Sequence, residues 1–128
     1  MTEIILPWPP PELSPNARVD RRAVAGIRKS YRHACGWAAT AAGHRAMAAG
    51  PLHIDLTFLP PDRRPRDLDN MLSAIKSGLD GLADVIRVDD SWWSITIRKG
   101  EPVPGGAVKV TIGPPVEAET VPLKGTIS

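Results

Sequence analysis

The feature that most constrains the fold is a change in the spacing of the apolar residues between residues 51 and 83. In "PLHIDLTFLP", apolar and polar side chains alternate, which is the period of a half-buried β-strand. Proline and charge end this strand at "PPDRRPR". In residues 68–83 the apolar positions are instead three or four apart (Leu68, Leu72, Ile75, Leu79 and Leu82). That spacing predicts an amphipathic helix that begins near Leu68 or Asp69 and runs to about Ala83.

The remaining segments add a second helix and more strands. "EIILPW", "WWSITIRKG" and "GGAVKVTIG" are predicted strands, and "PPPELSPN" is predicted to be an extended connection because successive prolines resist helix. From Asp20 to about Ala48 the pattern is helical, with one packing face and one cationic face. We therefore expect a small single-domain α/β (α+β) fold, in which two main helices pack on a mixed sheet.

The length of the chain and its single cysteine argue against a peptide hormone or a disulfide-stapled miniprotein. A chain of 128 residues is about one domain with a real core. We expect the domain to cover residues 1–113, followed by a flexible tail over residues 114–128. Cys35 is the sole cysteine, so no internal disulfide can form. Nothing resembles a signal peptide or the roughly twenty apolar residues of a membrane span, so we expect a cytoplasmic protein with no membrane partner.

The charges are unevenly distributed along the chain. Residues 18–66 contain ten Lys or Arg and three Asp, whereas residues 67–90 contain six Asp against Lys76 and Arg87. A basic region therefore borders an acidic centre. This arrangement suits the capture of phosphates beside a bound metal ion.

Two pairs of carboxylates form the acidic centre: Asp67 with Asp69, and Asp89 with Asp90. Two carboxylates about 5 Å apart repel each other by roughly 3 kcal/mol at an effective dielectric constant of about 20. If the four converge, neighbouring arginines or a divalent metal must compensate, and Mg²⁺ favours one or two carboxylates plus waters and phosphate oxygens. A structural interpretation also stands. In it, Asp67 or Asp69 caps the helix, its partner pairs with Arg63, Arg64 or Arg66, and Asp89 and Asp90 form a plain turn.

Three stretches together carry a family resemblance. "LPWPPPELSPN", "PDRRPRDLDNMLSAIKSGLDGL" and "VIRVDDSWW" resemble the RusA family of crossover (Holliday) junction endodeoxyribonucleases, including its small phage and prophage versions. The likeness covers most of residues 6–112. It implies a small α/β domain that forms a homodimer and depends on Mg²⁺, which Mn²⁺ can replace. The carboxylates that match the family's catalytic metal ligands are Asp67, Asp69 and Asp90.

One position departs from the family pattern. Ser73 stands where the well-known branch of the family has a lysine, and Lys76 lies one further turn along the same helical stripe. We expect Lys76 to add positive charge at the scissile phosphate; the alternative is a surface lysine that pairs with Asp80 or Asp69.

These observations predict a metal-dependent nuclease that cuts branched DNA, with a four-way junction as its substrate. Cations are expected to contact DNA phosphates without reading sequence: Arg21, Arg28, Lys29, Arg32, Arg63, Arg64 and Arg66. Resolving a junction requires paired nicks, so we expect a twofold dimer. The alternatives are a non-catalytic DNA-binding protein on the same fold and a metal-dependent phosphoesterase that acts on small substrates.

Overall fold

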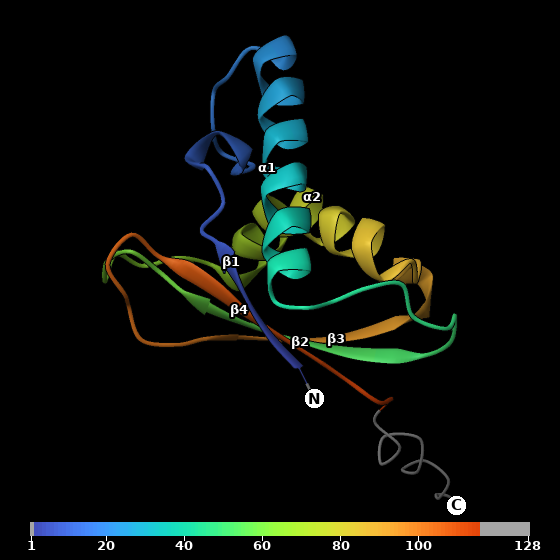
Figure 1. The fold of residues 1–128 in the computed structure, drawn as a ribbon. Coiled ribbons are helices and arrows are strands. Elements are labelled where there is room, and N and C mark those ends of the chain that lie inside the picture. Colours follow the sequence, from blue (N-terminus) through green and yellow to red (C-terminus); the bar gives the residue numbers. More distant parts are fainter. Residues whose placement is uncertain (1, 116–128) are drawn as a thin grey trace, which may run out of the picture.

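The computed structural model describes residues 2–115, so most of the predicted tail, residues 116–128, lies outside the described residues. The elements follow one another along the chain as shown in Figure 1. They are β1 (Thr2–Pro7), the 3-10 helix η1 (Pro11–Leu13), α1 (Arg21–Ala41), β2 (Leu52–Leu59), α2 (Leu68–Ile86), the 3-10 helix η2 (Asp90–Trp92), β3 (Trp93–Lys99) and β4 (Ala107–Gly113). No helix in this part of the chain is long and apolar enough to cross a membrane.

The strands form one mixed sheet in the order β1-β4-β2-β3. Strand β4 pairs antiparallel with both β1 and β2, whereas β2 and β3 are parallel. Parallel neighbours need a crossover connection, and α2 supplies it. Both helices lie over the same face of the sheet (Figure 1). The prediction of a small single-domain α+β fold, with two helices on a mixed sheet, is therefore confirmed.

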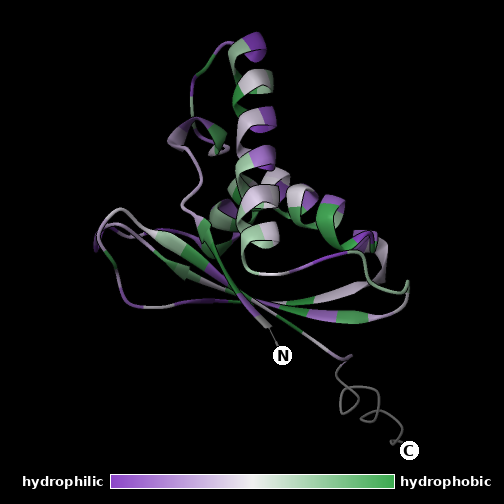
Figure 2. Ribbon diagram, viewed as in Figure 1, coloured by the Kyte–Doolittle hydropathy of each residue, from purple (hydrophilic) through white to green (hydrophobic). Residues whose placement is uncertain are grey.

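The core lies between this sheet face and the helices. Alternate residues of β2 are buried, as the sequence predicted, and they meet buried residues of β1 and β4 at the same level of the sheet. The central strands supply Ile54, Leu56, Phe58, Val108, Val110 and Ile112. Figure 2 shows the same alternation of hydrophobic and hydrophilic residues along the strands. Helix α2 covers this surface with its apolar stripe, which leaves its polar stripe on the outside.

The two helices cross very closely. Gly78 and Gly81 of α2 face α1, where a β-carbon on Gly78 would lie 2.8 Å from the sulfur of Cys35. One turn earlier on α1, the Tyr31 hydroxyl donates a 2.6 Å hydrogen bond to the Pro7 carbonyl, which ties α1 to the end of β1. Burial raises the pKa of the Cys35 thiol to about 11, so this cysteine is a neutral core residue.

The predicted end of the first helix was wrong. Helix α1 ends at Ala41 and not near Ala48, because Gly43 adopts a φ of 93°. The amide of Gly43 donates to the Thr40 carbonyl, and the amide of His44 donates to Ala39, so the last carbonyls are satisfied by a turn. The alanine-rich segment that follows is irregular.

The other boundaries differ less from the predictions. Helix α2 starts at Leu68 as predicted but extends past Ala83 to Ile86, where Arg87 adopts a left-handed conformation with a φ of 60°. The proline-rich connection after β1 contains the short helix η1 and is therefore not extended throughout. Trp92 belongs to η2, so the strand that was predicted from it begins one residue later.

Candidate metal and phosphate site on helix α2

A cavity of about 330 Å³ brings together residues that are far apart in the sequence. Asp69, Ser73 and Lys76 line it from α2, at spacings of four and three residues that place them on one stripe of the helix. Asp90 lines it from η2, just before β3. Four apolar side chains complete the lining: Leu72, Leu79, Trp93 and Ile95. Two of the three predicted metal ligands and the predicted cationic residue therefore share one cavity.

The charged groups of this cavity have no ionic partners within residues 2–115. No ion pair in this range involves Asp69, Asp90 or Lys76. The alternative in which Lys76 pairs with Asp80 or Asp69 is thus not what the structure has. Two carboxylates and an ammonium group remain available here for a metal ion and a phosphate.

The neighbouring arginines are paired with other acids. Arg66 lies 2.9 Å from Asp62 and Arg64 lies 3.2 Å from the same carboxylate, whereas Arg63 pairs with Glu101 at 3.3 Å. The hydrogen bond from Arg66 holds the pKa of Asp62 far below its usual value, and bonds from Arg64 add to this effect. The interpretation in which these arginines neutralise Asp67 or Asp69 is therefore wrong for the described residues.

The structure also separates the two acids of the Asp89–Asp90 pair. The Asp89 carboxylate accepts a 3.0 Å hydrogen bond from the amide of Ser91 and caps η2. Hydrogen bonds from Ser91 lower the pKa of Asp89. Asp90 is the first residue of η2 and lines the cavity. Asp89 thus has a structural role, whereas Asp90, the member of the pair that was predicted to be a metal ligand, faces the cavity.

Asp67 lies elsewhere. It is the N-cap residue of α2, but its side chain makes no capping hydrogen bond. It lines a different cavity of about 570 Å³, together with Trp8, Arg66 and Asn70. No group of three or more His, Cys, Asp or Glu side chains in residues 2–115 is arranged to hold a metal ion. The predicted set of three carboxylates is therefore divided between two sides of the first turn of α2.

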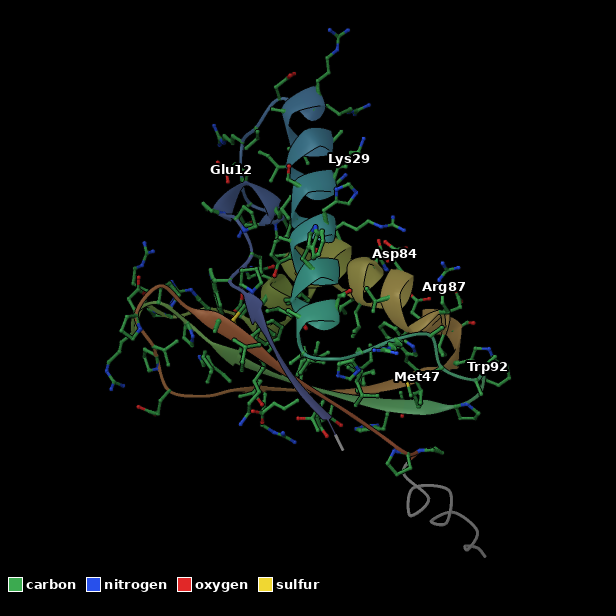
Figure 3. The ribbon with its side chains drawn as sticks, in the orientation of Figure 1. Glu12, Lys29, Met47, Asp84, Arg87 and Trp92 are labelled. Carbon is green, nitrogen blue, oxygen red and sulfur yellow. The ribbon has the colours of Figure 1, made fainter. Side chains whose placement is uncertain are left out.

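The predicted DNA-binding residues fall into four groups. Arg28 lines a cavity of about 490 Å³ with Ser73, Lys76 and Asp80, so it lies next to the candidate site. Figure 3 shows Lys29 on the outer part of α1, and Arg21 is likewise exposed there. Arg32 is paired with an acid, because its guanidinium donates two hydrogen bonds of 2.7 Å to Asp84 of α2.

Arg63, Arg64 and Arg66 form the fourth group, before α2. The side chains of Arg63 and Arg64 are 79% and 78% exposed, whereas that of Arg66 is 17% exposed. Arg63 and Arg64 are therefore accessible to solvent, while Arg66 is a fixed charge at the wall of the cavity that Asp67 lines.

Sequence reasoning missed Trp8, Asp62 and Asn70. Asp62 and Arg66 lie in a segment that is not helical, so their spacing of four residues was no signal for the ion pair that they form, whereas Asn70 follows Asp67 by about one helical turn. No local pattern predicts that Trp8 lies near Arg66 and Asn70, because these residues are far apart in the chain.

No family model matches the chain. A protein of Xylella fastidiosa (strain Temecula1 / ATCC 700964), described as "Uncharacterized protein", is 38% identical to this chain over 97 residues. The alignment covers 70% of this chain and 61% of that relative. The chain thus spans about three-fifths of the length of the curated relative that it matches.

Proposed function

We propose that the chain is a Mg²⁺-dependent endonuclease of the cytoplasm that nicks branched DNA, with the four-way junction as its substrate and a twofold dimer as its working form. The observation that carries this proposal is the cavity in which Asp69, Asp90 and Lys76 meet without ionic partners in residues 2–115. Two carboxylates that share a cavity repel each other, and a bound divalent cation would reduce that repulsion.

The donor set fits the metal. Mg²⁺ usually keeps several waters and binds through one or two carboxylates plus substrate phosphate, so Asp69 and Asp90 suffice as its protein ligands. When bound, the metal would supply an activated water and positive charge for the leaving oxygen. Lys76 would hold the scissile phosphate near the two acids. Mn²⁺ is expected to replace Mg²⁺ because it accepts the same ligands.

The surrounding cations support a nucleic-acid substrate over a small phosphate ester. Arg28 lies beside Lys76 in the adjoining cavity, and Arg63 and Arg64, which precede α2, have exposed side chains. A polyanion is bound by several cations along its backbone, whereas a single phosphate would need only Lys76.

The metal-ligand assignment is tested by comparing variants of two adjacent acids, Asp89 and Asp90. Asp90→Asn is expected to abolish Mg²⁺-dependent nicking of a labelled four-way junction, because asparagine lacks the anionic charge that the metal requires. Asp69→Asn is expected to do the same and to spare binding in chelator. Asp89→Asn should nick like the unmodified protein, because its amide oxygen can still accept from Ser91. Equal nicking by the Asp89 and Asp90 variants would contradict the assignment.

A non-catalytic DNA-binding protein on the same fold is the second candidate. It is favoured by the position of Asp67, which lines a different cavity from Asp69 and Asp90. This candidate predicts junction binding that is unaffected by Mg²⁺ and no nicks with any divalent metal. The same assay therefore separates the two candidates.

A further inference from the structure

The cavity that contains Asp67 has the chemistry of a site for a flat, aromatic ligand. It has a volume of about 570 Å³, within the range of roughly 300–1,000 Å³ that is usual for small-molecule sites. Its apolar surface comes from Trp8, Phe58, Met71 and several prolines. Its polar groups are the amides of Asn16 and Asn70, the hydroxyl of Ser14, and the charges of Arg64, Arg66 and Asp67. Apolar walls with a few polar groups are typical of sites that orient a planar heterocycle.

The aromatic wall is held in place. The indole of Trp8 meets the ring of Phe58 edge to face, with ring centroids 6.3 Å apart and an angle of 85° between the planes. The backbone of Gly106 supports it, since a β-carbon there would lie 2.9 Å from Cβ of Trp8. The indole is therefore oriented before any ligand arrives.

The cation of the cavity is also fixed. Arg66 lies with its guanidinium carbon 5.6 Å from the centroid of the Trp8 ring. Its Nη1 is 2.9 Å from the Asp62 carboxylate and donates to the carbonyls of Asp62 and Arg64 at 3.2 Å each. These bonds keep the guanidinium over the Trp8 ring, at the wall of the cavity.

We propose that this cavity binds an unpaired nucleobase of the substrate strand. A base offers a π-face to the indole and a hydrogen-bonding edge to the amides of Asn16 and Asn70, which is how proteins hold bases outside a duplex. This inference rests on the proposed function, in which Asp69 is a metal ligand at the scissile phosphate. Asp67 and Asn70, which line the cavity, are close neighbours of Asp69 in the chain. A base in this cavity would place its own backbone next to the first turn of α2. The cavity would thereby position the scissile phosphate relative to the strand.

The test measures binding without cleavage. The probes are a short single-stranded oligothymidylate and an abasic strand of the same length, both titrated in chelator. Stacking of a base on an aromatic side chain strengthens binding, so Trp8→Ala is expected to lower the preference for the base-containing strand about tenfold. Its affinity for the abasic strand should stay unchanged. Trp8→Phe retains a stacking surface and should keep most of the preference.

Trp37→Ala is the matched control, because Trp37 is 74% exposed and does not line the cavity. It should leave the preference unchanged. If thermal unfolding shows that Trp8→Ala is not folded, Asn16→Ala replaces it, since Asn16 is exposed at the cavity rim and its loss is expected to lower the preference several-fold. An unchanged preference in the folded variant overturns the inference.

Junction nicking by the same proteins separates the two proposals. Nicking that persists while the base preference is unchanged in the Trp8 variant would remove this inference and leave the proposed function standing. If the unmodified protein binds neither strand nor junction, both proposals fall.

Discussion

At the scale of single residues, the acids of this protein divide by whether they have partners. Asp62, Asp84 and Asp89 each accept hydrogen bonds that lower their pKa. Asp69 and Asp90, by contrast, share a cavity and have no ionic partner in residues 2–115. The sequence did not predict this division. The contact of Asp84 with Arg32 joins residues far apart in the chain, and the local bonds of Asp62 and Asp89 depend on the conformation of irregular segments.

The Arg32–Asp84 pair gives a pH prediction. The hydrogen bond from Arg32 lowers the pKa of Asp84 below its ordinary value of 3.8, so the pair stabilises the fold above that pH and the stabilisation is lost as the pH falls through the folded-state pKa. Asp84→Asn should therefore lower the melting temperature slightly at pH 7, by no more than a few degrees because both groups are about half exposed.

Melting curves of both proteins between pH 7 and pH 2 check this, and the difference should vanish at the acid end. A difference that persists there would show that Asp84 acts through packing and not through its charge. The variant should also bind junctions at least as well as the unmodified protein, since Arg32 would be released to contact phosphate.

At the scale of elements, the crossing of α1 and α2 is the most restrictive contact. A β-carbon on Gly81 would overlap the carbonyl oxygen of Arg32 and lie 3.1 Å from the amide nitrogen of Gly36. Backbone atoms cannot move aside as a side chain can. Gly81→Ala should therefore lower the free energy of unfolding by about 3 kcal/mol or more.

Gly26→Ala is the control, because a β-carbon there meets nothing within 4 Å. It should raise the free energy of unfolding by about 1 kcal/mol, since alanine favours helix over glycine. Urea unfolding of both variants provides the measurement. A Gly81→Ala protein as stable as the Gly26→Ala protein would show that the helices separate easily.

The elements themselves were largely predictable. The strand period at residues 52–59 and the helical period from Leu68 are local patterns, and the structure follows them. The end of α1 was not predictable from alanine content, because a left-handed Gly43 outweighs the helix propensity of the residues that follow. The meeting of Asp69 with Asp90 depends on how α2 crosses to β3, which no local pattern contains.

At the scale of the whole molecule, cations lie on two different faces. Arg21 and Arg28 are seven residues apart on α1, on the same helical face, and Arg28 adjoins the cavity with Lys76. Arg98 and Lys109 both pair with Thr57 in the strand register. They lie on the sheet face that points away from the helices. If DNA binds over the helices, only the first pair should contact phosphate.

Arg21→Gln combined with Arg28→Gln should weaken junction binding and reduce the salt dependence of the affinity. Each lost phosphate contact removes about 0.9 from the slope of log K against log salt, so the slope should fall in magnitude by about 2. Arg98→Gln combined with Lys109→Gln removes the same net charge and should leave the slope nearly unchanged. Titrations across a range of salt concentrations, in chelator, measure both. If the two double variants lose affinity equally, the effect is one of overall charge, and the DNA does not lie preferentially along α1.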